Sequence, residues 1–151
     1  YYAMRFIRGR SYSSAIAKFH RESEGDKFKF STLEFKQLLN RFVSVCQTIH
    51  YAHVRGILHR DIKPDNVMIG DFGETLVVDW GMAKFIEKEV SDVPAESKAQ
   101  SLNPIKLSSA SQTMMGSFAG TPAYAPPEQI KGQINLLCSA SDVYSLGAML
   151  Y

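Results

Sequence analysis

One long amphipathic helix, over about residues 32–55, constrains the fold more than any other segment. Its apolar residues keep to one face at helical spacing: Phe35, Leu38, Leu39, Phe42, Val45, Cys46, Ile49 and Ala52. Ser31 is predicted as the N-cap, Glu34 completes a capping box, and Gly56 is predicted to end the helix. Such a stripe has to be buried, so the chain is expected to form a packed domain.

Two short β-rich runs follow the helix, "VMI" at 67–69 and "TLVV" at 75–78, separated by "GDFGE". Glycines on both sides of an aspartate between apolar runs predict a β-hairpin, because glycine accepts the positive φ of tight turns. Asp71 is therefore expected at the tip of the hairpin.

The remaining segments give weaker signals. Residues 1–9 are typical of a strand closed by Gly9, 11–22 of a short helix, and 85–118 of a polar, serine-rich loop. After a proline-rich turn and a brief helix near 127–130, the end of the chain reads as a helix. Ser139 or Ser141 is predicted to cap it, with Val143, Leu146 and Leu150 on its buried face.

Composition sets limits on function. The chain has 151 residues, is 45% hydrophobic and 21% charged, and has a formal charge of +2. That charge is too small to favour a nucleic-acid surface, and no apolar run has the length of a membrane span. Two cysteines form no disulfide framework, which favours a reducing, cytoplasmic location. Because the chain starts on Tyr1 without a Met and stops inside a helical pattern, we expect it to be part of a longer protein, whose membrane anchor, if any, would lie elsewhere.

The segment "HRDIKPDN", residues 59–66, brings an acid, an amine and an amide onto one short loop. This combination suits phosphoryl transfer: Asp61 would take a hydroxyl proton, Lys63 would meet phosphate charge, and the Asn66 amide oxygen would bind Mg²⁺.

The same segment resembles the catalytic loop of protein kinases, H-R-D-L-K-P-x-N, with Ile62 in place of Leu. Lys63 together with Thr121 is similar to the pattern of serine/threonine kinases, in particular the bacterial, eukaryotic-like type. The resemblance implies an α+β, protein kinase-like fold consisting mainly of the helical C-terminal lobe. Residues 1–9 would be the last N-lobe strand and hinge, and 10–151 a partial C-lobe, so that the rest of the N-lobe and the last helices would be missing.

The resemblance also assigns the metal-binding aspartate. In the family this residue follows the loop asparagine by one complete hairpin, which leads from Asn66 to Asp79 and not to Asp71. The metal motif is therefore expected at residues 79–81, Asp-Trp-Gly, with Asn66 and Asp79 holding Mg²⁺, and "DFG" at 71–73 is expected to be a coincidence of turn composition.

Later segments match in the family's order. "GTPAYAPPEQ" at 120–129 resembles the end of an activation segment spanning 79–128, with Pro126-Pro127-Glu128 where Ala-Pro-Glu is usual and Thr121 seating the substrate hydroxyl residue. "SDVYSLG" at 141–147 resembles the helix that anchors the catalytic loop.

The resemblance assigns an ATP site as well. Met4 would be the gatekeeper, the backbone of Arg5 and Ile7 would meet the adenine, and Met68 would line its lower face. Lys63, Asn66 and Asp79 would contact the phosphates directly or through Mg²⁺.

Histidines and an arginine receive structural or regulatory roles by the same resemblance. His53 would lie near Asp142, His59 would pack beneath the catalytic loop, and Arg60 would receive a phosphate from the activation segment. A zinc site at His50, His53 and His59 is not favoured, because the sequence offers no cysteine partner at suitable spacing.

The implied function is a Mg²⁺-dependent serine/threonine protein kinase that uses ATP and a protein substrate. Without a Gly-rich loop and a strand lysine ahead of Tyr1, the chain alone is expected to be inactive. Two alternatives stay open: a pseudokinase that acts as a scaffold, and an aminoglycoside-type small-molecule phosphotransferase, which shares part of the "HRDIKPDN" pattern.

Overall fold

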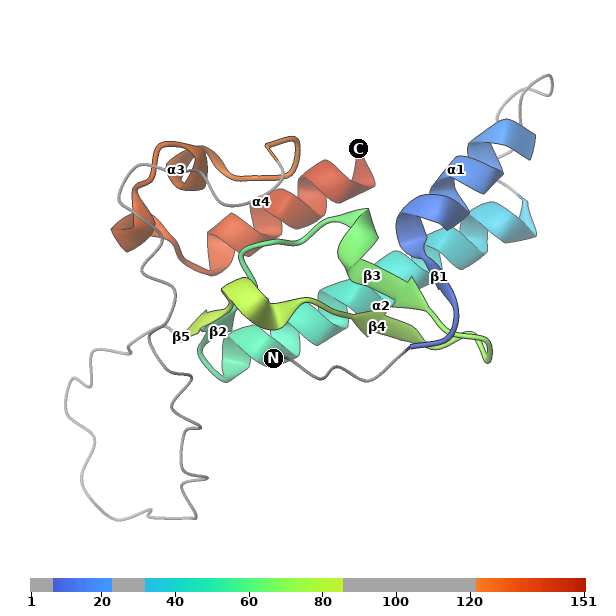
Figure 1. Ribbon diagram of the computed structural model, residues 1–151, viewed down its shortest axis with the longest axis horizontal. Coiled ribbons are helices and arrows are strands. Elements are labelled where there is room, and N and C mark those ends of the chain that lie inside the picture. Colours follow the sequence, from blue (N-terminus) through green and yellow to red (C-terminus); the bar gives the residue numbers. More distant parts are fainter. Residues whose placement is uncertain (1–6, 23–31, 86–121) are drawn as a thin grey trace, which may run out of the picture.

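The computed structural model describes residues 7–22, 32–85 and 122–151. Most of the strand predicted over residues 1–9 and nearly all of the polar loop predicted over 85–118 lie outside the described residues. The described part is a mixed α/β structure with two small sheets (Figure 1). None of its helices combines the length and apolar character that a bilayer span requires.

The long predicted helix is α2, Leu33–Val54. Its N-cap is Thr32, whose Oγ1 accepts a hydrogen bond from the Phe35 amide at 3.3 Å. The prediction of Ser31 as N-cap was wrong by one residue. Residues 31 and 32 both carry a hydroxyl that can cap a helix, so the sequence alone does not distinguish them. The shift removes Glu34 from the capping-box position. Gly56, at φ 73°, follows the helix as predicted.

The predicted apolar stripe of α2 is confirmed along its centre. Val45, Ile49 and Ala52 are buried. Leu38, Phe42 and Cys46 pack half-buried against the core. Leu39 is 38% exposed, against prediction, because it is rotated by about 100° from Leu38 and falls at the edge of the stripe.

The predicted hairpin is formed by β3, Val67–Ile69, and β4, Thr75–Val77. Val67 pairs with Val77 and Ile69 with Thr75. The Gly70 amide donates to the Glu74 carbonyl at 2.9 Å to close the turn. A short strand, β1 at Arg10–Ser11, adds to β3 and completes a three-stranded antiparallel sheet.

The other elements surround this hairpin and α2. They are α1 (Tyr12–Glu22), β2 (Ile57–Leu58), η1 (Pro64–Asn66), η2 (Trp80–Met82), β5 (Lys84–Phe85), α3 (Pro127–Ile130), η3 (Ile134–Leu136) and α4 (Ser139–Leu150). Strands β2 and β5 form the second sheet. In Figure 1 the segment between β2 and η1 runs between α4 and the hairpin, so the predicted catalytic loop lies at the centre of the molecule.

Helix α4 differs from its prediction in its N-cap and in its buried face. Its N-cap is Cys138, and Ser141 accepts a hydrogen bond from the Cys138 amide at 3.1 Å, so neither Ser139 nor Ser141 is the cap itself. Leu146 is buried as predicted, whereas Val143 and Leu150 are exposed. The helix instead buries Leu146 together with Met149, since the burial of Asp142 fixes which face points inward.

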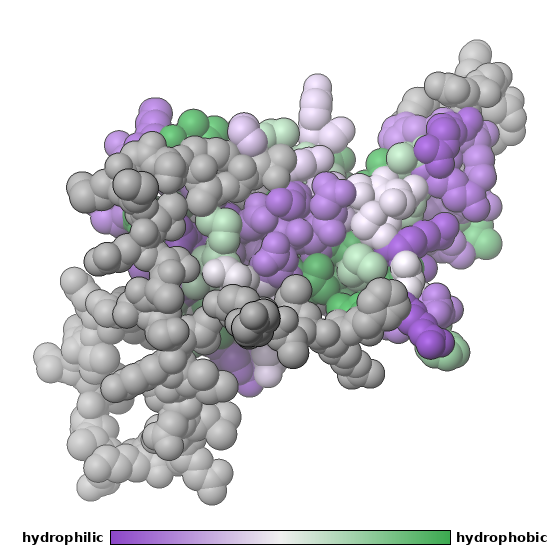
Figure 2. Space-filling view, viewed as in Figure 1, coloured by the Kyte–Doolittle hydropathy of each residue, from purple (hydrophilic) through white to green (hydrophobic). Residues whose placement is uncertain are grey.

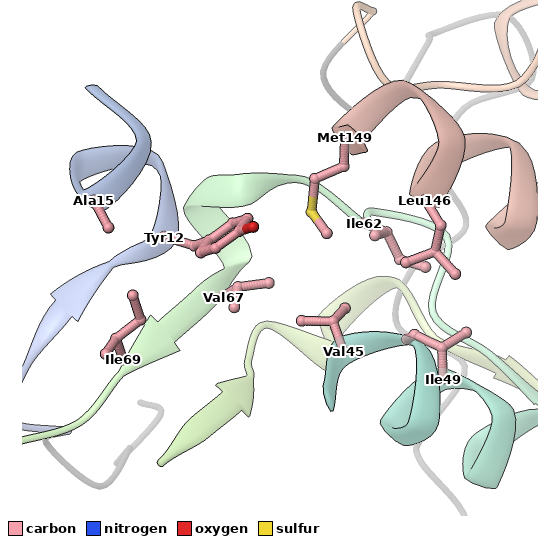
Figure 3. Packing of buried hydrophobic residues seen from close by; sticks show 9 residues of the cluster. All are labelled: Tyr12, Ala15, Val45, Ile49, Ile62, Val67, Ile69, Leu146 and Met149. Carbon is pink, nitrogen blue, oxygen red and sulfur yellow. The ribbon is translucent and has the colours of Figure 1, made fainter. Parts of the chain in front are cut away.

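The hydrophobic core joins three helices, the hairpin and the catalytic loop (Figure 3). It consists of Tyr12, Ala15, Val45, Ile49, Ile62, Val67, Ile69, Leu146 and Met149. In the close-up, side chains of α4 point down toward Ile62 and Val67, and those of α2 face them from below. Full burial of one such side chain stabilises by about 1.5–3 kcal/mol. Ile62 belongs to this core and lies between Asp61 and Lys63 in the chain. Its burial therefore fixes the loop at the position of these two polar residues.

Candidate active site

The three polar residues predicted on the catalytic loop come together. The Asn66 amide donates to the Asp61 carbonyl and to Asp61 Oδ2, both at 2.8 Å. Lys63 Nζ lies 2.9 Å from the same Oδ2. The 3-10 turn that starts at Pro64 folds the chain back, so that Asn66 can reach Asp61. One carboxylate is thus held by an amide and an ammonium group.

Asp142, at the start of α4, anchors the backbone of the loop. Its carboxylate accepts hydrogen bonds from the backbone amides of His59 and Arg60, each at 2.9 Å, and lies 2.8 Å from His53 Nε2. The carboxylate is 1% exposed. Buried carboxylates are stable only when fully hydrogen-bonded, and this one satisfies that condition through three donors. The predicted position of His53 near Asp142 is confirmed.

His59 is buried directly beneath the loop, as predicted. Its Nε2 lies 3.1 Å from the Val78 carbonyl, which can only accept, so Nε2 carries the proton. Nδ1 then accepts from the Asp61 amide at 3.3 Å. Burial lowers the pKa of His59, against the opposing effects of the Val78 carbonyl and of the nearby Asp142, Asp61 and Asp79 carboxylates. The imidazole is therefore a neutral link between the loop and the end of β4.

The hairpin register places Asp79 next to the loop and Asp71 away from it. Val78 donates from its amide to the Asn66 carbonyl at 2.9 Å, so the residue that follows Val78 emerges beside Asn66. Asp71 is exposed in the turn at the opposite end of the hairpin. Of the two aspartates, Asp79 is the one that the fold brings to the catalytic loop.

The residues present fit a bound Mg²⁺. Because the Asn66 NH₂ group donates to Asp61, its amide oxygen is left for a cation, and oxygen is the ligand type that Mg²⁺ prefers. Asp79 is exposed, with φ 60°. A Cβ on Gly81 would lie 3.3 Å from Asp79 Oδ1, so glycine at this position leaves room for the carboxylate.

Trp80 occupies the middle of the predicted metal motif and packs inward. Its ring centroid lies 4.5 Å from that of His59, and its indole N–H donates to the Val77 carbonyl at 3.0 Å. The side chain also packs against the core. Phenylalanine could supply the ring contact but not the hydrogen bond, so Trp80 ties the start of the predicted activation segment to β4.

The remaining predicted site residues are less constrained. Met68 is half-buried in the middle of β3, and Ile7 is half-buried ahead of β1. Met4, Arg5 and Thr121 lie outside the described residues.

Arg60, predicted to receive a phosphate, is half-buried and has a left-handed backbone at φ 70°. Among the described residues no partner reaches its buried Nε atom. Burial lowers the pKa of its guanidinium, which the Asp142 carboxylate partly offsets. A buried cation with an unused donor can bind an anion, but the prediction of a phosphate there stays a prediction.

Sequence reasoning missed one contact to the loop. Gln129, in α3, is 8% exposed, and its Nε2 donates to the Arg60 carbonyl at 2.9 Å. Next to it, Glu128 accepts a hydrogen bond from Ser141 at 2.5 Å. Only the position of Gln129 directly after Glu128 could have drawn attention to it, because no local pattern connects residues so far apart in the chain.

Comparison with known proteins agrees with this geometry. The family model of the protein kinase domain matches residues 4–151. The chain belongs to the protein kinase family. It is 38% identical over its whole length to the serine/threonine-protein kinase PknD of Protochlamydia amoebophila. Identity to proteins of the same name is 36% in Chlamydia trachomatis serovar L2b and 33% in Chlamydia felis, again over the whole chain.

This kinase-family chain covers 15% of the length of the Protochlamydia relative and 16% of each of the two Chlamydia relatives. The family match confirms the resemblance inferred from "HRDIKPDN" and implies a kinase-like fold.

Proposed function

We propose that this chain supplies the catalytic loop and metal-binding residues of a serine/threonine protein kinase, which transfers the γ-phosphoryl group of ATP to Ser or Thr hydroxyls of proteins. The observation that carries the proposal is the Asp61 carboxylate, held at 2.8 Å by Asn66 and at 2.9 Å by Lys63, on a loop whose backbone is fixed by Asp142. The names of the relatives support the choice of Ser and Thr over Tyr.

Asp61 is the group that accepts or orients the proton of the substrate hydroxyl. Its side chain is 10% exposed, so it is largely shielded from bulk water without being fully enclosed. Lys63 is within reach of the same oxygen and offers positive charge to the phosphoryl group in transfer. Positioned acids and bases of this kind contribute about 10²- to 10⁴-fold in rate.

Asn66 and Asp79 would hold Mg²⁺, which neutralises phosphate charge when bound. Their own contribution is to present an amide oxygen and a carboxylate from the two ends of one hairpin. Residues 1–9 would form the hinge and last N-lobe strand, with Met4, Arg5, Ile7 and Met68 around the adenine. The other residues, 10–151, would form part of the C-lobe.

The test uses the full-length protein with labelled ATP, Mg²⁺ and a mixture of Ser/Thr-containing peptides. Asp61→Asn should lower turnover by about 10²-fold or more while leaving the KM for ATP within about twofold. Phosphorylation of an aminoglycoside in place of peptides would show a small-molecule phosphotransferase. ATP binding with no turnover in the wild-type protein would show a pseudokinase.

A further inference from the structure

Gln129 reaches the catalytic loop from a different element and touches none of the atoms proposed to react. Its Nε2 donates to the Arg60 carbonyl at 2.9 Å, and the residue is 8% exposed. Gln129 is the side chain that satisfies this carbonyl, and an apolar replacement would remove that partner.

The peptide unit between Arg60 and Asp61 is held on both sides. Gln129 binds its carbonyl, and His59 Nδ1 accepts from its N–H at 3.3 Å. This unit carries the Cα of Asp61, so its orientation sets the direction of the Asp61 side chain.

The backbone before this peptide unit is strained. Arg60 has φ 70°, a left-handed conformation that costs a residue with a Cβ about 1–2 kcal/mol. Such a conformation persists only where its surroundings impose it. The Asp142 carboxylate accepts from the Arg60 amide at 2.9 Å, and the Gln129 side chain donates to the Arg60 carbonyl. Both backbone polar groups of the strained residue are therefore hydrogen-bonded to side chains.

Helix α3, which carries Gln129, is itself fixed to α4. Glu128 accepts a hydrogen bond from Ser141 at 2.5 Å, and its carbonyl accepts from the Gln133 amide at 2.8 Å. Ser141 directly precedes Asp142 in α4. Gln129 and Asp142, which bind the backbone of Arg60, therefore belong to two elements that are hydrogen-bonded to each other, α3 and the start of α4.

We infer that Gln129 is a positioning residue for catalysis: its amide fixes the Arg60–Asp61 peptide and thereby aims the Asp61 carboxylate. The inference rests on the proposed function. It makes helix α3, directly after the predicted activation segment, a determinant of the geometry at Asp61, since a shift of α3 that separates Gln129 from the Arg60 carbonyl would release the Arg60–Asp61 peptide.

The experiment compares Gln129→Leu with Ser145→Ala in the full-length protein. Leucine keeps most of the volume but cannot donate. Ser145 borders the same small hollow as Gln129 and Arg60 and donates within α4, so it controls for local packing. For Gln129→Leu we expect kcat to fall by about ten- to hundredfold, with the KM for ATP within about twofold. For Ser145→Ala we expect kcat within about twofold of wild type.

A second variant, Gln129→Glu, separates positioning from simple filling of space. A protonated carboxyl can donate to the Arg60 carbonyl, whereas the ionised form cannot. A glutamate carboxyl has an ordinary pKa near 4.3, and burial at this position favours its protonated form. The ratio of the variant's kcat to that of wild type should therefore rise as pH is lowered from about 7.5 to about 5. A flat ratio, or a Gln129→Leu enzyme with wild-type kcat, would overturn the inference. Should Gln129→Leu not fold, the pH profile of Gln129→Glu decides alone.

Failure of the proposed function looks different. In that case the wild-type protein shows no Asp61-dependent phosphorylation, and hydrogen exchange over residues 59–66 becomes the readout. Gln129→Leu should accelerate exchange there and Ser145→Ala should not. Equal exchange in the two variants would refute the positioning role, whatever reaction the protein performs.

Discussion

Two tripeptides of the same pattern, Asp71-Phe72-Gly73 and Asp79-Trp80-Gly81, lie at opposite ends of one hairpin and differ in almost every physical respect. Phe72 is 98% exposed, whereas Trp80 contacts His59 and donates to the Val77 carbonyl. A Cβ on Gly73 would meet nothing within 4 Å, whereas one on Gly81 would approach Asp79.

The difference shows that position in the fold, not the letters of the motif, decides which aspartate belongs to the site. At the tip the pattern serves a turn: Gly73 takes φ 87°, and Glu74 accepts from the Phe72 amide at 3.1 Å. At the base it follows the strand that pairs beside Asn66. Figure 2 shows mostly hydrophilic residues at the lower right, where the tip of the hairpin lies, which agrees with a solvated turn.

The largest expected effect is on activity. Asp79→Ala should lower Mg²⁺-dependent turnover of the full-length protein by about 10²-fold or more, because a carboxylate proposed to hold the cation is lost. Asp71→Ala should leave turnover within about twofold, since it changes an exposed turn. Steady-state rates measured over a range of Mg²⁺ concentrations test both. Reversed effects would mean that the hairpin had been assigned the wrong metal residue.

The next effect is on stability and compares the anchor of the loop with the tip of the hairpin. Asp142→Ala leaves the His59 and Arg60 amides and His53 without their shared acceptor, so the complete kinase domain should lose about 3–5 kcal/mol of unfolding free energy. Glu74→Ala removes an acceptor from an exposed amide that water can satisfy. Its loss should stay below about 1 kcal/mol in the same denaturant titration. Equal losses would contradict the central role of Asp142.

A smaller effect separates the two aromatic residues. Trp80→Phe keeps a ring beside His59 but removes the hydrogen bond to Val77, and should cost about 1 kcal/mol. Phe72→Ser should cost close to nothing, because the ring it removes is almost fully exposed. Thermal denaturation of the complete domain measures both changes. A larger loss for Phe72→Ser would show that the tip packs against another part of the protein.

The smallest effect concerns pH. Burial lowers the pKa of His59 in the folded state, so below its usual value near 6.5 the unfolded chain binds more protons than the folded one. The stability that the neutral imidazole provides is full above about pH 6.5 and is lost as pH falls through that value. Unfolding free energies at about pH 7.5 and 5.5 should therefore differ less in His59→Asn than in wild type. The exposed His50→Asn should retain the wild-type difference, and a wild-type difference in both variants would contradict the neutral state of His59.

Local sequence patterns predicted the helices and strands of this molecule well. Features that depend on contacts between distant residues were predicted less well. The hairpin and α2 follow from glycine placement and apolar periodicity, which act over a few residues. The N-cap at Thr32 in place of Ser31 shows how little separates two adjacent hydroxyls. The α4 face was misjudged because burial of Asp142, a tertiary effect, sets which side points inward.

The candidate site divides in the same way. The contact of Asn66 with Asp61 is local to one loop, and the approach of Asp142 was anticipated through resemblance to a family. Gln129 had no such guide: its hydrogen bond to Arg60 depends on how α3 docks, and the residues between them carry no signal of it.

The most direct test of the central claim is cleavage of the full-length protein by Fe²⁺ bound in place of Mg²⁺ in the presence of ATP, hydrogen peroxide as oxidant and a reductant that regenerates Fe²⁺, with the cut sites located by mass spectrometry. Radicals generated at the metal cut the nearest backbone. The account predicts cuts close to Asn66 and Asp79 that disappear in Asp79→Ala and persist in Asp71→Ala. Cuts centred on residues 70–74 that disappear in Asp71→Ala would contradict it.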